Sequence, residues 1–278
     1  MQENDKGLAP ILQLLMATRG FDFSGYHPAM LERRIGQRLP KVLCRDFEEY
    51  HSFLRETPGE IDQLIDIVTI NVSSFFRNTL TFELLAEKIL PAIVQEKVRN
   101  GLNSLRIWSA GCAMGEEPYS LAILLDELLE KEAVAMHVHI FATDIDTRIL
   151  AAAAEAVFQE EQLAEVKYRL HGKYFTREGG GLRLLTRIRE KVNFSFYDML
   201  DKKHRVPPAS IFGNFDLILC RNLLIYFNAP YQETIFAKLY HALAENGYLV
   251  LGEVEAPNRQ YQRYFGRMFD YSSIYRKE

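Results

Sequence analysis

Residues 105–119 read LRIWSAGCAMGEEPY, and the turn within this stretch decides the fold. Leu105–Ala110 is a short apolar run of the kind that forms a buried strand, and a helix is expected from Pro118 onward. The small residues that follow the strand, beginning at Gly111, permit a tight turn and the close approach of a ligand to the backbone. The stretch therefore predicts a ligand-binding strand–turn–helix unit.

Two acids, Glu116 and Glu117, stand where this helix begins. A dinucleotide-binding turn would carry the pattern GxGxxG and hold a pyrophosphate at the helix N-terminus, where these acids would repel it. They suit a ligand with a positively charged amino group or a sulfonium. Their alternative role is to stabilise the positive end of the helix dipole. The residues alone leave both roles open.

A second acidic segment, Asp144-Ile145-Asp146, follows the strand-like run Val138–Thr143. In Rossmann-like folds an acid at the end of the second strand accepts hydrogen bonds from both ribose hydroxyls. The alternative is that an aspartate caps the next helix. Position favours Asp144 for the ribose and Asp146 for the cap.

Strand-like and helical segments alternate after residue 104, which predicts a mainly parallel sheet with helices on both faces. Further strands are expected at 192–196, 216–220 and 248–252, and helices at 118–130, 147–156 and 231–244. Residues 174–185 break the alternation. A glycine cluster there separates two strand-prone runs, which predicts a hairpin in a small antiparallel subdomain at about 172–190.

The first hundred residues show helical spacing of apolar residues, with capping signatures at Asp46 and at Thr57-Pro58. We expect an N-terminal helical domain over 1–78, a linking helix over 79–103 that is bent near Pro91, and an α/β domain over 104–278. A helix that begins near Pro28 is expected to run to Pro40, because proline cannot continue it.

The composition is that of a globular cytoplasmic protein. Hydrophobic residues make up 48% of the 278, and no apolar run approaches the roughly 20 residues that cross a bilayer, so no membrane insertion is expected. The three cysteines are far apart, which fits a reducing compartment and predicts no metal site. A net charge of −4 argues against nucleic acid as a partner.

Four segments together resemble the chemotaxis receptor methyltransferases, the CheR family, over essentially the whole chain: TINVSSFFR at 69–77, WSAGCAMGEEPY at 108–119, ATDID at 142–146 and CRNLLIYF at 220–227. The resemblance implies a Rossmann-like class I methyltransferase domain with a β-subdomain, preceded by an all-α domain. It implies that S-adenosylmethionine donates a methyl group to glutamate side chains of methyl-accepting chemotaxis receptors. The products would be glutamyl methyl esters and S-adenosylhomocysteine.

The resemblance also implies which residues surround the cofactor. They are Asn71, Ser73, Arg77, Gly111, Glu117, Asp144, Asp198, Met199, Arg221 and Asn222. Arg77 is suited to hold the cofactor carboxylate bidentately. Tyr226 falls near the transferred methyl group, where it orients the substrate carboxylate or walls the pocket. We assign the catalytic roles to Tyr226 and Arg77.

Several positions depart from the family pattern. Ser73 replaces a threonine but keeps the hydroxyl, and Asp198 replaces an asparagine and so loses an amide donor. Gly252–Glu255 reads GEVE where the family tends to read GHSE. This last departure motivates an alternative function, a non-catalytic CheR-like sensor or adaptor that binds S-adenosylhomocysteine or another nucleotide.

The substrate side is predicted in the helical domain and in the hairpin. Arg33, Arg34 and Arg38 belong to a locally basic segment that could steer the acidic methylation helices of a receptor, or could be an ordinary solvated helix face. By analogy with the family, the hairpin subdomain is the second candidate, because an edge strand can hold a C-terminal receptor tail peptide. No Ser-His-Asp or Cys-His set is present in the predicted site, and transfer to an ionised glutamate requires none.

Overall fold

The computed structural model describes residues 5–69 and 73–278. It divides into two compact units. One consists of Met1–Asn71 with Ile225–Tyr231, and the other of Val72–Leu224 with Gln232–Glu278. The boundaries expected at 78 and 103 stay predictions. Within the described ranges, no helix is both long enough and apolar enough to span a bilayer.

The helical unit is built from short helices around a common apolar core: α1 (Asp5–Arg19), α2 (Pro28–Gly36), the 3₁₀ turn η1 (Leu39–Val42), α3 (Phe47–Glu56) and α4 (Pro58–Thr69). The predicted cap of α3 is confirmed, since the N–H of Glu49 donates to Asp46 Oδ1 at 2.8 Å. Helix α2 ends earlier than expected, at Gly36. Pro40 has no N–H to offer the carbonyl of Gly36, and it lies instead in η1.

A buried carboxylate in α4 binds the start of η1 and helix α3. Glu60 is 6% exposed and accepts hydrogen bonds from Arg38 at 2.5 and 2.7 Å and from the Tyr50 hydroxyl at 2.8 Å. Burial alone would raise the pKa of Glu60, but the bonds from Arg38 and Tyr50 lower it below its usual value. The half-buried guanidinium of Arg38 is therefore held by the buried carboxylate of Glu60.

The second unit contains a seven-stranded sheet in the order β6-β2-β1-β7-β8-β10-β9. The strands are β1 (Ser104–Ala110), β2 (His137–Asp144), β6 (Val192–Phe196), β7 (Phe215–Cys220), β8 (Leu243–Leu251), β9 (Phe265–Arg267) and β10 (Ile274–Lys277). The first five in spatial order are parallel, and β10 and β9 add antiparallel strands at one edge. The predicted α/β fold is confirmed. Strands β9 and β10 were not predicted from the sequence, because such short strands show no clear alternation.

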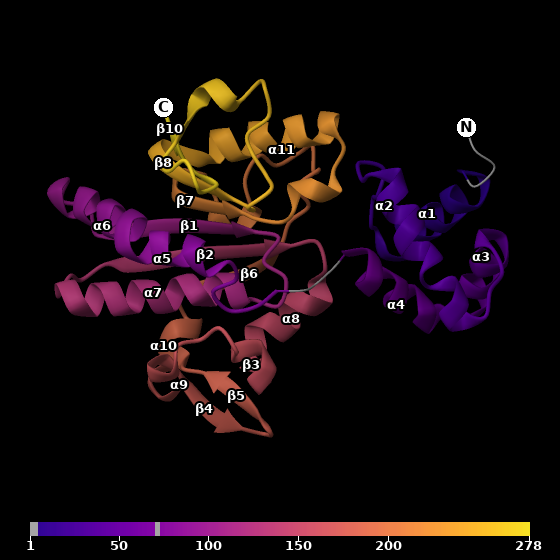
Figure 1. Cartoon of the computed structure of the whole chain (residues 1–278), viewed down its shortest axis with the longest axis horizontal. Helices are drawn as coiled ribbons and strands as arrows, with labels where there is room; N and C mark the ends of the chain where they lie inside the picture. The colour runs from indigo at the N-terminus through magenta and orange to yellow at the C-terminus, as the bar shows by residue number, and fades with distance from the viewer. Residues whose placement is uncertain (1–4, 70–72) are drawn as a thin grey trace. The chain divides into compact units, whose positions relative to one another are not determined.

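Helices cover both faces of this sheet (Figure 1). They include α7 (Glu116–Glu132), α8 (Thr147–Glu155), α11 (Ala229–Ala242) and the composite helix α5 (Thr79–Leu84), η2 (Leu85–Ile89) and α6 (Leu90–Arg99). The composite helix was expected to be bent or interrupted at Pro91. Its irregularity lies one turn earlier, in the π-helical segment η2, where the N–H of Leu90 bonds to Leu85 O. A proline just after this segment has no N–H for the regular ladder.

The small antiparallel subdomain is present, with strand order β3-β5-β4. Strands β4 (Phe175–Glu178) and β5 (Gly181–Leu184) form the predicted hairpin, and Gly179 and Gly180 supply its turn with φ of +59° and +87°. Strand β3 (Val157–Phe158) is too short to be recognised in the sequence. The hairpin is preceded by η3 (Glu160–Leu163) and α9 (Tyr168–Tyr174) and followed by α10 (Thr186–Arg189).

Charged contacts fasten this β-subdomain to helix α7. Glu127 accepts from Lys173 at 2.5 Å and from the Tyr174 hydroxyl at 2.8 Å, and it also pairs with Arg169. Burial by itself would raise the pKa of Glu127, but these bonds outweigh it and lower the pKa to about 2. The ionised carboxylate of Glu127 is therefore more stable in the folded protein than in the unfolded chain.

We predict that Glu127→Gln lowers the free energy of unfolding at pH 7 by about 1–3 kcal/mol, because charge-assisted bonds are lost. A carboxyl whose folded pKa lies below its usual 4.5 stabilises the fold above that pH. The difference between variant and wild type should therefore shrink as pH falls from 4.5 toward 2. Denaturant titrations across this range measure it. Glu130→Gln is the control, since that side chain is 65% exposed and its pair with Lys173 contributes little. A pH-independent difference would contradict the prediction.

Candidate functional site

The turn after β1 is tied to the end of β2. The N–H groups of Gly111 and Cys112 both donate to Thr143 O, at 2.8 and 3.0 Å. Gly111 and Gly115 adopt φ of +74° and +91°, which glycine takes at little cost. A side chain at Gly115 would also press on Ala153 and Phe194 at 3.1 Å. The predicted tight turn is present, and it leads directly into α7.

Asp144, at the end of β2, faces this turn. Its Oδ2 accepts from the N–H of Ala113 at 3.0 Å, and its Oδ1 accepts from the N–H of Asp146 at 3.2 Å. Burial raises the pKa of Asp144, and the bonds from these N–H groups oppose the rise. Asp146 caps α8, as its position suggested, because its Oδ1 accepts from the N–H of Arg148 at 2.9 Å.

Glu117, in the first turn of α7, lies in a buried network. Its Oε1 accepts from the Ser109 hydroxyl at 2.8 Å, and its Oε2 pairs with Arg221 Nη1 at 3.0 Å. Arg221 also donates through Nη2 to Arg77 O and to Asn78 Oδ1, both at 2.7 Å. Ser109 and Asn78, which were not predicted from the sequence, are members of this network. The network joins β1, α7, the end of β7 and the loop before α5.

Glu116 takes a different direction from its neighbour. It is 1% exposed, and its Oε1 accepts from Gln162 Nε2 at 3.0 Å. Among the described residues its Oε2 has no hydrogen-bond partner. Burial raises the pKa of Glu116. Hydrogen bonds from its own N–H and from Gln162 lower this pKa but do not cancel the effect of burial. These contacts with η3 favour Glu117, of the two acids, as the residue that faces a ligand.

The loop at 73–78 is held onto the start of α7. The ring of Phe75 packs against Phe158 and Phe175, with centroids 4.8 and 5.5 Å away. The N–H of Phe76 donates to the Ser120 hydroxyl at 2.9 Å. Ser73 and Arg77 are half-buried in this loop. Asn71, which was also assigned to the cofactor, lies outside the described residues.

The end of β6 adjoins Asp144. The N–H of Tyr197 donates to Asp144 O at 3.1 Å, which places Asp198 and Met199 beside the acid proposed for the ribose. Asp198 Oδ1 accepts from the N–H of Leu200 at 2.7 Å, so one carboxylate oxygen closes the local turn. Met199 is 6% exposed. Gly111, Glu117, Asp144, Asp198, Met199, Arg221 and Asn222 therefore all stand at the carboxyl edge of the parallel strands, where open α/β sheets bind ligands.

Tyr226 belongs to the helical unit, although it follows β7 closely in the sequence. The N–H of His27 donates to Tyr226 O at 2.9 Å, and the guanidinium of Arg34 lies 5.8 Å from the centre of the Tyr226 ring. These residues line a cavity of about 620 Å³ together with Arg33 and Met30. The structure thus brings two of the residues predicted for the substrate side, Arg33 and Arg34, together with Tyr226, which was predicted to be catalytic. It engages the third, Arg38, with Glu60 instead.

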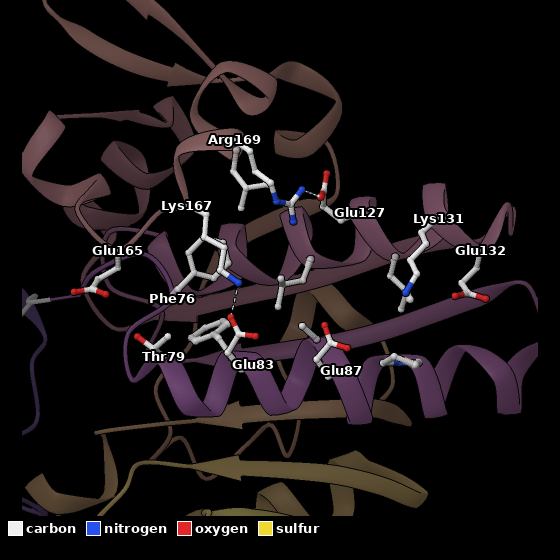
Figure 2. Close-up of a pocket in the computed structure, with 16 residues that line it drawn as sticks. Phe76, Thr79, Glu83, Glu87, Glu127, Lys131, Glu132, Glu165, Lys167 and Arg169 are labelled. Atoms are coloured by element: carbon white, nitrogen blue, oxygen red, sulfur yellow. Dashed lines mark hydrogen bonds and ion pairs between the residues drawn. The ribbon is translucent and has the colours of Figure 1, made fainter.

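A second cavity, of about 540 Å³, lies between the α5–α6 helix and α7. Figure 2 shows its charged rim, where Lys167 pairs with Glu83 at 2.6 Å and Arg169 pairs with Glu127. Of the residues predicted for the cofactor, none of those that the structure describes lines this cavity. We therefore locate the site from its hydrogen-bonding groups rather than from cavity size.

Comparison with known proteins agrees with this geometry. Residues 71–271 match the family described as CheR methyltransferase, SAM binding domain, and residues 6–69 match CheR methyltransferase, all-alpha domain. The chain belongs to the CheR methyltransferase family. Among its CheR relatives, the chemotaxis protein methyltransferase of Borreliella burgdorferi is 33% identical over 89% of this chain and 87% of its own length. The protein of the same name from Listeria monocytogenes is 32% identical over 85% of this chain and 84% of its own length. The one from Escherichia coli is 31% identical over 91% of this chain and 85% of its own length.

The cofactor of a CheR protein is S-adenosylmethionine, and the hydrogen-bonding groups of this site fit it. A nucleoside with an amino-acid tail offers two ribose hydroxyls as donors and carries a positive charge at its sulfonium and ammonium groups. Asp144 and Glu117 supply carboxylate oxygens as hydrogen-bond acceptors at the matching strand end and helix start. A dinucleotide would instead place a pyrophosphate against Glu117.

We predict that Asp144→Ala weakens binding of S-adenosylhomocysteine by about 1–3 kcal/mol, or about 5- to 150-fold, because it removes the side-chain oxygens that accept from the ribose. Isothermal titration calorimetry measures the change. Asp146→Ala is the matched control. It removes the cap of α8 and should cost about 1 kcal/mol of stability while leaving the affinity within about threefold. Equal affinities for Asp144→Ala and wild type would mean that the ribose lies elsewhere.

Proposed function

We propose that this CheR protein transfers the methyl group of S-adenosylmethionine to glutamate side chains of methyl-accepting chemotaxis receptors. The observation that carries the proposal is the gathering of Glu117, Asp144 and Arg221 at one edge of the sheet in a chain of this family. The names of the relatives, chemotaxis protein methyltransferase, support the receptor as the substrate.

The reaction needs alignment more than acid–base assistance. A receptor glutamate is ionised near neutral pH, and its carboxylate oxygen is the nucleophile without a general base. The bound cofactor supplies an electrophilic methyl group on its sulfonium. The methyl ester forms as the methyl–sulfur bond breaks, and S-adenosylhomocysteine leaves with the electron pair. The protein holds the two reactants in line, which is a proximity effect.

In this proposal each cofactor group has a partner of matching chemistry. Asp144 accepts from the ribose, Glu117 faces the ammonium, and Arg77 binds the carboxylate. Asp198 and Met199 flank the adenine, and Ser73, Gly111 and Asn222 complete the wall. The buried pair with Arg221 supports the role of Glu117, because it fixes the direction of the carboxylate.

The substrate side of the proposal rests on the cavity of the helical unit. Arg34 donates to Ile67 O at 2.8 Å and packs on the Tyr226 ring, so both side chains are held in place. Arg33 is exposed beside them. We assign to Tyr226 a hydrogen bond to the incoming carboxylate, and to Arg33 and Arg34 the steering of acidic receptor helices. Arg38 is left out of this surface because Glu60 binds its guanidinium.

Receptor-containing membranes incubated with the protein and tritiated S-adenosylmethionine should acquire label that base releases as methanol, as expected of a glutamyl ester. Tyr226→Phe should lower kcat by about 10- to 100-fold, since it removes one hydrogen bond to a charged group.

Tyr231→Phe is the control, because it also removes a tyrosine hydroxyl from this segment. The Tyr231 hydroxyl contacts the Ser24 hydroxyl at 3.3 Å. It should retain kcat within about twofold. Folded protein that binds S-adenosylhomocysteine but labels no receptor would refute the proposed reaction. Such a result would favour the alternative of a non-catalytic sensor.

We also propose that β4 docks a receptor tail peptide. Within the described sheet β4 pairs with β5 alone, and Thr176, Arg177 and Glu178 are exposed. A two-residue turn makes Glu178 and Gly181 a hydrogen-bonded pair. Because such pairs alternate along an antiparallel ladder, the N–H of the preceding residue, Arg177, points away from β5. An extended peptide can accept a bond there and add a strand.

Fluorescence anisotropy with a C-terminal receptor peptide tests this docking. Arg177→Pro removes the outward N–H at an edge position that tolerates proline, and it should weaken binding by about tenfold or more. Arg177→Ala keeps the N–H and should remain within about threefold of wild type. If both variants lose binding equally, the Arg177 side chain holds the peptide rather than the strand edge.

A further inference from the structure

A buried carboxylate joins the loops that leave two neighbouring strands. Glu255 is 6% exposed, and its Oε2 accepts from the N–H of Gly252 at 2.7 Å and from the N–H of Asn222 at 2.9 Å. Gly252 follows β8 and Asn222 follows β7, and these strands lie side by side in the sheet. One oxygen atom therefore fixes the backbone at the carboxyl ends of both strands.

The local backbone is shaped around this oxygen. Asn222 adopts φ of +55°, a conformation that asparagine tolerates better than most residues. The N–H of Glu255 returns a bond to Gly252 O at 2.9 Å, which closes a tight turn. A Cβ atom at Gly252 would lie 2.6 Å from Glu255 Oε2 and 2.9 Å from Asn222 N, so a larger residue cannot fit.

The residue before Asn222 is Arg221, whose side chain binds Glu117, Arg77 O and Asn78. The direction in which a side chain leaves the backbone depends on the backbone dihedral angles around it. By holding the N–H of Asn222, Glu255 holds the peptide that links Arg221 to Asn222. The bond thus fixes the position from which the Arg221 side chain leaves the backbone, and the guanidinium of that side chain orients Glu117.

We propose that Glu255 is a positioning residue for the cofactor site, acting through Asn222 and Arg221 on Glu117. This inference rests on the proposed roles of Glu117 and Arg221 in that site. The inference also distinguishes the residues of the segment Gly252–Glu255. Glu255 makes the hydrogen bonds that position the site. Glu253 is exposed and Val254 is 83% exposed, so these two side chains make no comparable contribution to the site.

The test measures the affinity of the full-length protein for S-adenosylhomocysteine by calorimetry. Glu255→Gln should bind within about threefold of wild type, because an amide oxygen can accept both N–H bonds. Glu255→Asp retains the charge but is one methylene too short, and it should bind about tenfold or more weakly. Glu253→Asp is the matched control at an exposed position and should be unchanged.

A double-mutant comparison separates positioning from general loss of structure. If Glu255 acts through Arg221, Glu255→Asp should have less than about a twofold further effect on affinity in an Arg221→Met background. In an Asp144→Ala background, where the altered group is on another strand, its effect should persist in full. Urea unfolding of each variant reports whether the fold is retained.

Several results would overturn the inference. They are normal affinity in Glu255→Asp, an equal loss in Glu255→Gln, or an undiminished effect in the Arg221→Met background. In each case wild-type binding and receptor labelling would still support the proposed function. Failure of the wild-type protein to bind S-adenosylhomocysteine would instead overturn the proposed function itself.

Discussion

The buried ion pair between Glu117 and Arg221 is the interaction on which the rest of the site depends. Its partners are 104 residues apart in sequence, and the side chains of Arg221 and Glu117 are 2% and 12% exposed. Leaving either charge without its partner in this interior would be strongly unfavourable. The pair therefore requires β7, the start of α7 and the loop at 77–78 to keep one arrangement.

The parallel sheet explains why these groups meet. Because β6, β2, β1 and β7 run in the same direction, their carboxyl ends lie along one edge. Each strand delivers a different group there: Asp198, Asp144, the glycine turn and Arg221. Backbone bonds from Tyr197 to Asp144 and from Gly111 to Thr143 tie neighbouring loops together. The site is thus a consequence of strand direction combined with the residue that follows each strand.

Residues of the same type that are close in the sequence differ in what they contact. Glu116 binds Gln162 while Glu117 binds Arg221, because adjacent residues on a helix point about 100° apart. Arg34 lies within α2 and packs on Tyr226, whereas Arg38 follows the end of that helix and is bonded to Glu60. Glu253 and Val254 are exposed whereas Glu255 is buried. The two residues that depart from the family pattern therefore contribute less to the site than the sequence alone suggests.

The sequence by itself determined the features that depend on local residues: the alternation of strands and helices, the glycine turn, the hairpin at 175–184 and the caps at Asp46 and Asp146. Local hydrogen bonds and side-chain periodicity control these features, and both can be recognised in a short stretch. Tertiary structure decided which charges pair, as between Arg38 and Glu60 or Glu117 and Arg221. It also added β3, β9 and β10, whose few residues become strands because a neighbouring strand offers hydrogen bonds. Such pairings depend on contacts between distant residues, and local sequence carries no record of them.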